Sequence, residues 1–234
     1  MKVCALILAR ESSKSIESKN LVKLNDVPLL SYVIKPALEC EFFDEIWVST
    51  DSEAIIDLIE RIHRSVHIFK RSKQMATDEC SSLAAVQEFL NFKKDAEIIC
   101  LLQATSPSLY PQYLREAFEK MKQFQYDSVF SVTRDHKLRW SNCGNGVMRA
   151  INFDVSRRPR RQDWDGELVE SGHFYFATRE LIMSRNLLQN EQNTGYVEMP
   201  IEMCIELDYQ WQIPVLEIIL KNHGYIKALQ TRMK

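Results

Sequence analysis

Hydrophobic positions along the chain alternate between short continuous runs and segments of helical spacing. The continuous runs have the length of strands, and the segments between them place apolar residues three and four positions apart. Buried strands are predicted at residues 3–8, 45–49, 66–69, 98–102, 128–132 and 173–177. Helices are predicted from Pro28 to about residue 38, after a cap at Asp51 or Ser52 to about residue 62, and from the capping hydroxyls and Asp78 of residues 77–82 to about Phe92. Further helices are predicted from Pro111 onward and at about residues 213–223, the last of which Gly224 ends.

This alternation predicts an α/β fold, a Rossmann-like three-layer sandwich whose mainly parallel sheet is covered by helices on both faces. The rhythm breaks at about residues 133–170, which hold most of the turn signals, including Gly144-Asn145-Gly146 as a hairpin tip. Because this segment has too few apolar residues for a core of its own, we interpret it as a β-rich insertion in a single domain spanning residues 1–234.

Charge and composition exclude some classes of partner. The formal net charge of −2 gives no overall attraction to nucleic acid or to an acidic membrane surface, and no apolar run approaches the length of a membrane span. The six cysteines are scattered and form no Cys-x-x-Cys pair, which is typical of core residues in a reducing compartment. We therefore expect neither nucleic acid nor a membrane as a partner.

The first nine residues also have some character of a very short signal peptide. Their apolar part lies at the lower limit for such a segment, and no small-residue cleavage site precedes the charged loop. A buried strand is the better interpretation, and export is the alternative that the sequence leaves open.

The polar loop at residues 9–20 carries the first chemical signal. It follows a buried strand directly, and its cations Arg10, Lys14 and Lys19 can neutralise a triphosphate, while Ser12 and Ser13 can donate to phosphate oxygens. The spacing of a Walker loop is absent. Taken alone, the loop fits a solvated turn with scattered charges equally well.

Three polar turns are predicted to meet at one edge of the sheet. Ligands of doubly wound sheets bind beyond the carboxyl ends of the strands, and that rule places residues 10–19, 78–82 and 103–106 together. Convergence of three turns favours a binding site over a solvated loop.

A pair of carboxylates near the end of the chain suggests a metal site. If residues 205–208 form a short strand, Glu206 and Asp208 lie on the same face of it. Two carboxylates can share Mg²⁺ with phosphate oxygens, and Mn²⁺ or another divalent cation is an alternative. A solvated pair is the commoner fate of such residues, so the pattern alone does not establish a metal site.

The basic residues 157–161 have three interpretations. They form a solvated loop, or a nuclear import signal in a nuclear or cytoplasmic protein, or a binding site for an acidic sugar, since the guanidinium of Arg161 matches a carboxylate.

Four blocks of sequence together are similar to the cytidylyltransferases that make CMP-sialic acid, the N-acylneuraminate cytidylyltransferases, and to their animal type in particular. The blocks are residues 9–20, Leu-Gln-Ala-Thr-Ser-Pro at 102–107, residues 157–167 and Gly-His-Phe-Tyr-Phe at 172–176. The resemblance runs from residue 3 to about residue 224 in order and without large gaps. It implies the fold of the nucleotide-diphospho-sugar transferases. It also implies a homodimer or dimer of dimers that transfers CMP from CTP to the anomeric hydroxyl of a sialic acid and releases pyrophosphate.

The resemblance also implies roles for individual residues. Catalytic roles fall to Arg10, Lys19 and Asp208, and the metal would be held by Glu206 and Asp208. The nucleotide would be bound by Arg10, Ser13, Lys14, Lys19, Asn20, Arg71 and Ser82. The sugar would be bound by Gln103, Arg161, Ser171, Phe174 and Tyr175. Arg161 would take the carboxylate of the sugar and would reach the pocket of a neighbouring subunit.

Several positions depart from the pattern of this family. Ser15 stands where Gly is usual, Ser171 stands where Asn is common, and Gln210 and Gln212 replace acids that animal members carry. If the usual Gly has positive φ, Ser15 costs about 1 kcal/mol in backbone strain. These departures keep two alternatives open: a cytidylyltransferase for another 2-keto sugar acid such as 3-deoxy-manno-octulosonate, and a weakly active or inactive nucleotide-binding relative.

Overall fold

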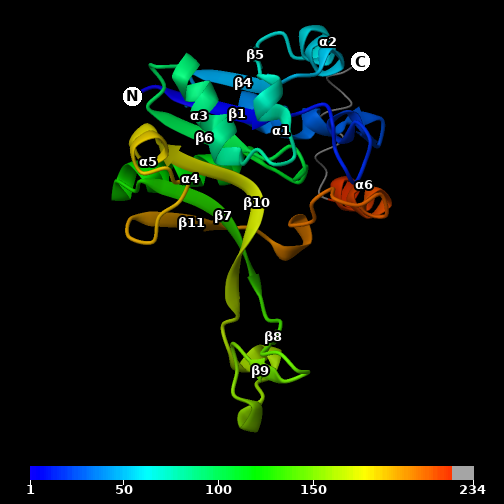
Figure 1. The fold of residues 1–234 in the computed structure, drawn as a ribbon, viewed down its shortest axis with the longest axis vertical. Helices are drawn as coiled ribbons and strands as arrows, with labels where there is room; N and C mark the ends of the chain where they lie inside the picture. Colours follow the sequence, from blue (N-terminus) through cyan, green and yellow to red (C-terminus); the bar gives the residue numbers. More distant parts are fainter. Residues whose placement is uncertain (223–234) are drawn as a thin grey trace.

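A seven-stranded sheet is the framework of the protein, whose computed structural model describes residues 1–222 (Figure 1). The strand order is β11-β7-β10-β6-β1-β4-β5. The strands are β1 Val3–Leu8, β4 Glu45–Thr50, β5 His67–Lys70, β6 Ile98–Leu102, β7 Ser128–Asp135, β10 Glu167–Thr178 and β11 Thr194–Glu198. Only β10 runs antiparallel to its neighbours among these strands, which confirms the predicted, mainly parallel sheet.

Helices cover both faces of the sheet. They are α1 Leu29–Leu38, α2 Glu53–Ile62, α3 Ser82–Phe92, α4 Pro111–Phe124, α5 Arg179–Ser184 and α6 Gln212–Asn222. Alternate residues of β1 face opposite layers: Val3 and Ile7 pack in the cluster that contains α1, α2 and α4, whereas Cys4 and Leu6 pack with α3 and α5. The predicted three-layer sandwich is therefore confirmed.

A third, smaller apolar cluster joins α6 to the hairpin of β2 Lys23–Leu24 and β3 Val27–Pro28. Leu207, just before α6, is fully buried in this cluster. Residues 204–208 form no strand, which corrects the predicted one. Glu206 and Asp208 nevertheless line the same pocket, because they flank the buried Leu207. The predicted end of the last helix at His223 and Gly224 lies outside the described residues.

Side-chain caps fix the start of α3 but not of α2. The hydroxyl of Ser81 accepts the N–H of Ala84 at 3.1 Å, as the hydroxyl-rich sequence predicts. Ser52 is the N-cap of α2 but its side chain makes no capping hydrogen bond. Asp78, a second predicted cap, is instead engaged with cations of the first loop.

The predicted insertion projects from the sheet as a separate feature (Figure 1). β7 and β10 continue beyond the body as a paired ribbon, which we call the stalk, residues 132–135 and 167–170. The stalk carries the lobe, residues 136–166, with the hairpin β8 Trp140–Asn142 and β9 Met148–Ala150. Gly144, Asn145 and Gly146 all have positive φ, which confirms the predicted tip.

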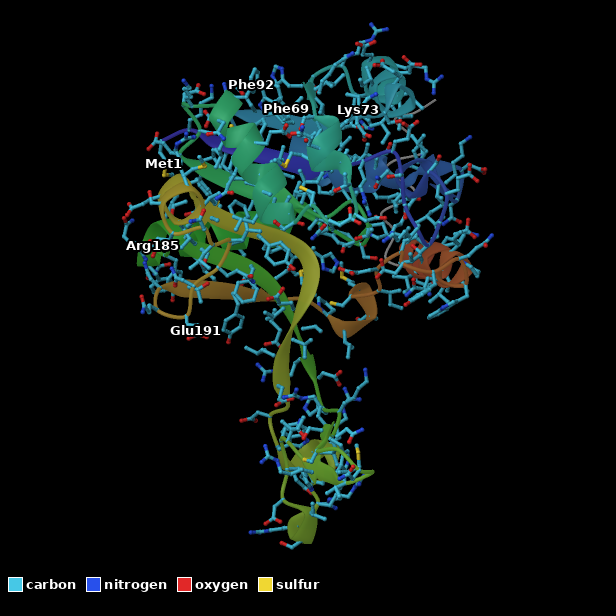
Figure 2. The ribbon with its side chains drawn as sticks, in the orientation of Figure 1. Met1, Phe69, Lys73, Phe92, Arg185 and Glu191 are labelled. Carbon is cyan, nitrogen blue, oxygen red and sulfur yellow. The ribbon has the colours of Figure 1, made fainter. Side chains whose placement is uncertain are left out.

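The stalk and lobe expose apolar side chains that would be buried in a typical core. Seven of them are 40–62% exposed: Trp140, Val147, Met148, Ile151, Val155, Leu168 and Val169. In the body, by contrast, large aromatic side chains such as Phe89 and Phe176 are fully buried between the layers. At the surface of the body, the half-buried Phe69 packs against the 59% exposed Phe92, with ring centroids 5.2 Å apart (Figure 2). Within residues 1–222, no helix has the length and apolar character needed to span a bilayer.

Candidate active site

The site lies at the carboxyl ends of β1 and β6, where the chain continues from β1 towards β4 on one side of the sheet and from β6 towards β7 on the other. β1 pairs with β4 on one side and with β6 on the other, so the loops after these strands diverge and leave a crevice at their carboxyl ends. The loops after β1, β5 and β6 all border one pocket there, which confirms that the three predicted turns converge.

This pocket, the arginine pocket, has a volume of about 210 Å³. It is lined by Leu8, Arg10, Arg71, Met75, Thr77, Asp78, Cys80, Ser81, Ser82, Ala85 and Gln103. Three of the predicted nucleotide-binding residues, Arg10, Arg71 and Ser82, therefore share one cavity. Gln103, predicted to face the sugar, lies with them.

Two of the three cations of the first loop, Arg10 and Lys14, are held by Asp78. Arg10 forms an ion pair with this carboxylate, and the ammonium of Lys14 lies 3.1 Å from its second oxygen. Lys14 and Arg10 together hold the pKa of Asp78 below its usual value. An anionic ligand entering the pocket would have to take the place of Asp78 on these two side chains.

Arg71 is held more rigidly than Arg10. It is 8% exposed, and its Nε and Nη2 donate to the side chain and carbonyl of Ser49 at 3.0 and 2.9 Å. Burial lowers its pKa. The first loop is closed by Asn20, whose side chain donates to the carbonyl of Arg10 at 2.9 Å, and Ser13 lies half-buried within that loop.

A second cavity, the carboxylate pocket, has a volume of about 540 Å³. It is lined by Glu170, Ser171, Gly172, Tyr175, Cys204, Ile205, Glu206, Asp208, Trp211 and Gln212. Both predicted metal ligands and two of the predicted sugar-binding residues, Ser171 and Tyr175, are thus brought together.

Glu206 is fixed against β10 by a close approach. Its Oε1 lies 3.3 Å from the hydroxyl of Ser106, which also donates to the carbonyl of Gly172. Gly172 has φ +73°, and a Cβ there would overlap Oε1 of Glu206. Burial, and then the negative charge of Asp208, raise the pKa of Glu206.

Asp208 connects the carboxylate pocket to the first loop. Lys19, from the first loop, places its ammonium 3.1 Å from Asp208 Oδ1. Gln212 orients the backbone beneath, because its Oε1 accepts the N–H groups of Asp208 and Tyr209, each at 2.7 Å. Sequence reasoning did not single out the contacts of Ser106 or this role of Gln212, since both depend on tertiary proximity.

The donor set fits a hard divalent cation. The negative charge of Asp208 disfavours that of Glu206, and the ammonium of Lys19 already lies beside Asp208. Within residues 1–222, no group of three or more His, Cys, Asp or Glu side chains could hold a metal. Two carboxylates suit an ion such as Mg²⁺, which completes its shell with phosphate oxygens and water.

Two predicted sugar-binding residues lie elsewhere. Phe174 is fully buried in the core beside Phe176, with ring centroids 5.9 Å apart, so the prediction that it packs against a sugar is wrong. Arg161 lies in the lobe, in the short 3₁₀ helix Arg161–Asp163, and lines neither the arginine nor the carboxylate pocket.

In the first loop, the residue with positive φ is not the one that was predicted. Ser18, not Ser15, has positive φ, at 48°, where the chain enters the 3₁₀ helix Lys19–Leu21. The serine in place of the usual glycine at position 15 therefore carries no left-handed strain.

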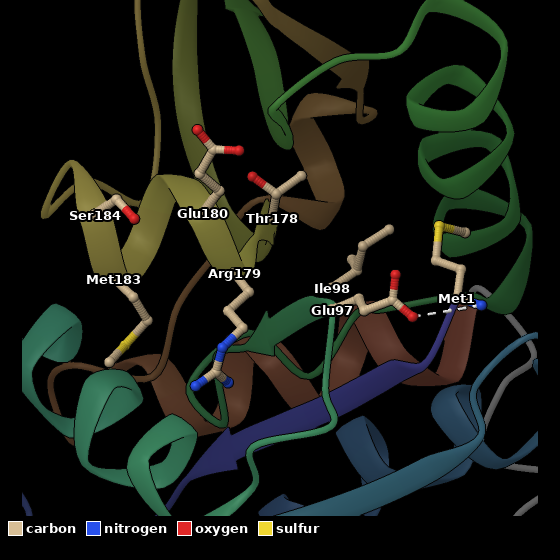
Figure 3. Close-up of a pocket in the computed structure, with 8 residues that line it drawn as sticks. All are labelled: Met1, Glu97, Ile98, Thr178, Arg179, Glu180, Met183 and Ser184. Carbon is tan, nitrogen blue, oxygen red and sulfur yellow. Dashed lines mark ion pairs between the residues drawn. The ribbon is translucent and has the colours of Figure 1, made fainter.

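A further pocket, of about 460 Å³, lies at the opposite end of the sheet (Figure 3). Its lining includes Glu97, Arg179 and Met183. The guanidinium of Arg179 is committed to the carbonyls of Leu90 and Lys93, each at 3.2 Å. None of the predicted site residues lines this pocket.

Comparisons with a family model and with known proteins point to the same family. The model of the family described as "Cytidylyltransferase" matches residues 4–232. N-acylneuraminate cytidylyltransferase A of Danio rerio is 42% identical over 95% of this chain and 52% of that protein. N-acylneuraminate cytidylyltransferase of Oncorhynchus mykiss is 40% identical over 95% of this chain and 51% of that protein. The chain thus spans about half the length of these relatives.

A solved structure is similar in fold. A CMP:2-keto-3-deoxy-manno-octonic acid synthetase complexed with CTP superposes with a TM-score of 0.70 at 16% identity, covering 95% of this chain and 100% of that one. At this identity the likeness concerns the fold alone.

Proposed function

Because the chain belongs to the cytidylyltransferase family, we propose that it transfers CMP from CTP to the anomeric hydroxyl of a sialic acid and releases pyrophosphate. The animal relatives favour a sialic acid over another 2-keto sugar acid. The observation that carries the proposal is the Lys19–Asp208 ion pair, which joins the cationic first loop to the acidic pair that lines the carboxylate pocket.

The triphosphate would bind through the first loop. Its oxygens replace Asp78 on Arg10 and Lys14, whose charges are otherwise neutralised within the protein. Arg71 and Ser82 line the same cavity and would contact the nucleotide, with Ser13 and Asn20 completing the loop.

The sugar acid would occupy the carboxylate pocket. Its anomeric hydroxyl attacks the α-phosphorus in line and releases its proton to water, the new O–P bond forms, and the bond to the pyrophosphate oxygen breaks with its electron pair leaving on pyrophosphate. Arg10 and Lys19 stabilise the negative charge that develops on the phosphates, so catalysis is mostly positioning and charge neutralisation. Glu206 and Asp208 would hold Mg²⁺, or Mn²⁺, which supplies further positive charge to phosphate oxygens when bound.

The partner that completes the site would be a second copy of the chain. The lobe exposes apolar side chains and is basic, with seven Lys and Arg residues against three Asp, whereas the whole chain has a net charge of −2. A homodimer, or a dimer of dimers, would cover the apolar side chains and bring Arg161 to the sugar carboxylate in the partner's pocket.

The basic residues 157–161 are exposed except for Pro159, which suits recognition by an import receptor. We propose a nuclear or cytoplasmic location. Microscopy of the tagged full chain tests this, and replacement of Arg157 and Arg158 by Ala should redistribute a nuclear signal.

A direct assay tests the activity. The protein is incubated with CTP, Mg²⁺ and a panel of sugar acids, and CMP-sugar and pyrophosphate are measured by chromatography. We expect equimolar CMP-sialic acid and pyrophosphate. Preference for 3-deoxy-manno-octulosonate would favour the alternative substrate, and CTP binding by calorimetry without any product would favour an inactive relative.

A further inference from the structure

A fully buried histidine lies directly behind the carboxylate pocket. The Nε2 atom of His173 is 3.2 Å from the carbonyl of Met203, and its Nδ1 atom is 3.1 Å from the hydroxyl of Ser171. Burial lowers the pKa of His173 to about 4, so the imidazole is neutral at neutral pH. A neutral imidazole has one N–H donor and one acceptor nitrogen.

The imidazole interacts with the backbone carbonyls of Met203 and Ser171, more strongly with the first, and its hydrogen bond to a carbonyl is the one from Nε2 to Met203. This contact decides where the proton lies. A backbone carbonyl can only accept, so Nε2 must carry the proton that it donates to Met203. Nδ1 is then the acceptor, and the hydroxyl of Ser171 must donate to it. The only proton of the Ser171 hydroxyl is therefore engaged in this hydrogen bond and cannot be donated to a ligand.

A neighbouring thiol does not change this conclusion. Cys204 interacts with Ser171, but its own proton is donated to the carbonyl of Pro200 at 3.2 Å. Sulfur is a weak acceptor. If the hydroxyl of Ser171 turned to this sulfur, its proton would still be committed to a protein atom.

Tyr175, in the same pocket, repeats the arrangement. Its hydroxyl donates to Glu170 Oε2 at 2.9 Å, and the other oxygen of Glu170 accepts from Gln189 at 3.0 Å. A carboxylate accepts only, so the proton of Tyr175 is also committed. The hydroxyls of Ser171 and Tyr175, which line the carboxylate pocket, can therefore accept a hydrogen bond from a ligand but cannot donate one.

We propose that Ser171 is a specificity-determining acceptor, held in that state by His173 as a positioning residue. It selects sugar acids that present an N–H or O–H donor to Ser171 in the carboxylate pocket and disfavours those that present only an acceptor. This inference rests on the proposed function, because it names the substrate chemistry of the same pocket. Ser171 would accept the hydrogen bond from the substrate, and His173 would keep the Ser171 hydroxyl in its acceptor state.

An isosteric substrate pair tests the selectivity. An N-acyl sugar acid and the matching O-acyl ester differ only in replacement of the N–H donor by an acceptor oxygen. Dissociation constants are measured by calorimetry with a non-hydrolysable CTP analogue and Mg²⁺. We expect the wild-type protein to bind the amide about tenfold or more tightly than the ester. The amide donates a hydrogen bond to Ser171, whereas the ester places an acceptor oxygen opposite another acceptor. In Ser171→Ala the preference should fall to within about threefold.

Ser108→Ala is the matched control, because Ser108 is a buried serine outside both pockets whose hydroxyl has no hydrogen-bond partner within the described residues. It should keep the preference of the wild type. An undiminished preference in Ser171→Ala would overturn the proposal.

The tautomer is measured independently of the substrate. Nitrogen-15 NMR of the five histidines, with His173→Gln to assign the signal, should show His173 as the neutral Nε2–H tautomer between pH 6 and 8. An Nδ1–H tautomer or an imidazolium would overturn the proposal whether or not the protein turns over any sugar acid. Absence of turnover with the Nε2–H tautomer present would instead count against the proposed function.

Discussion

The sheet edge and the lobe are built in opposite ways. At the sheet edge, functional side chains are tied to neighbours within the same chain: Arg71 to Ser49, Lys19 to Asp208, and Glu206 to Ser106. In the lobe, apolar side chains such as Val147 and Val155 are about 60% exposed, and Arg161 contacts neither pocket. The difference indicates that the side chains of the body are positioned by contacts within one chain, whereas the exposed apolar side chains of the lobe suit a second surface, which the proposed dimer would supply.

The largest expected effect is loss of the carboxylate pair in the body. Asp208→Ala should reduce turnover by roughly 100-fold or more, because it removes charge that orients Lys19 and would hold a divalent cation. Turnover is measured as pyrophosphate release. Asp57→Ala, an exposed residue of α2, is the control and should keep normal turnover. Equal activity of the two variants would remove Asp208 from the mechanism.

A pair of glycines compares the two regions directly. Gly172 and Gly146 have φ +73° and +77°, but a Cβ meets Glu206 at the first and open space at the second. Gly172→Ala should lower the unfolding free energy by about 3 kcal/mol and also reduce turnover, because backbone strain and overlap add. Gly146→Ala should cost only about 1 kcal/mol. Denaturant unfolding measures both, and similar losses would contradict the close approach.

Acid should destabilise the body through two histidines, the fully buried His173 and the half-buried His63. Burial lowers the pKa of His63 and of His173 from 6.5 to about 4, so both are neutral in the folded protein and gain protons more readily when it is unfolded. Their contribution to stability is present above pH 6.5 and is lost as the pH falls through 6.5 towards 4, by up to about 3 kcal/mol for each.

Denaturant unfolding at a series of pH values measures this loss. His173→Gln should flatten the dependence between pH 6.5 and 4, and the same substitution at the exposed His67 should leave it unchanged. A slope that His173→Gln does not alter would contradict the assignment of a buried neutral imidazole.

The smallest effect on folding is expected in the lobe. Replacing Val147, Ile151 and Val155 by Ser should change the unfolding free energy of a single chain by no more than about 0.5 kcal/mol, because these side chains are already exposed. The same variant should sediment as a monomer if the lobe forms the dimer contact. Val129→Ser, fully buried in β7, should by contrast cost more than about 2 kcal/mol.

Much of the fold follows from the sequence because its strands are buried on both faces. The run Val3–Leu8 is predicted with the bounds observed, since a continuous apolar run between polar turns has few alternatives. The insertion is also predicted, because its turn signals and exposed polar residues cannot build a core.

The site is predicted less completely, for two physical reasons. Ion pairs such as Arg10–Asp78 join residues 68 positions apart, and no local pattern records them. Phe174 shows the other reason: along a strand, 174 and 176 share one face and 175 the other. Alternation thus separates Phe174 from Tyr175, although resemblance to a family groups them.

Complementation between two defective chains tests the central claim most directly, that the body of one copy works with the lobe of another. Asp208→Ala has an intact lobe, and Arg161→Ala has an intact body. Each variant alone should be nearly inactive with the sugar acid. Co-expressed chains that pair at random should recover about a quarter of wild-type turnover, because half of the dimers hold one complete site. Mixed dimers that are present but inactive would contradict the account.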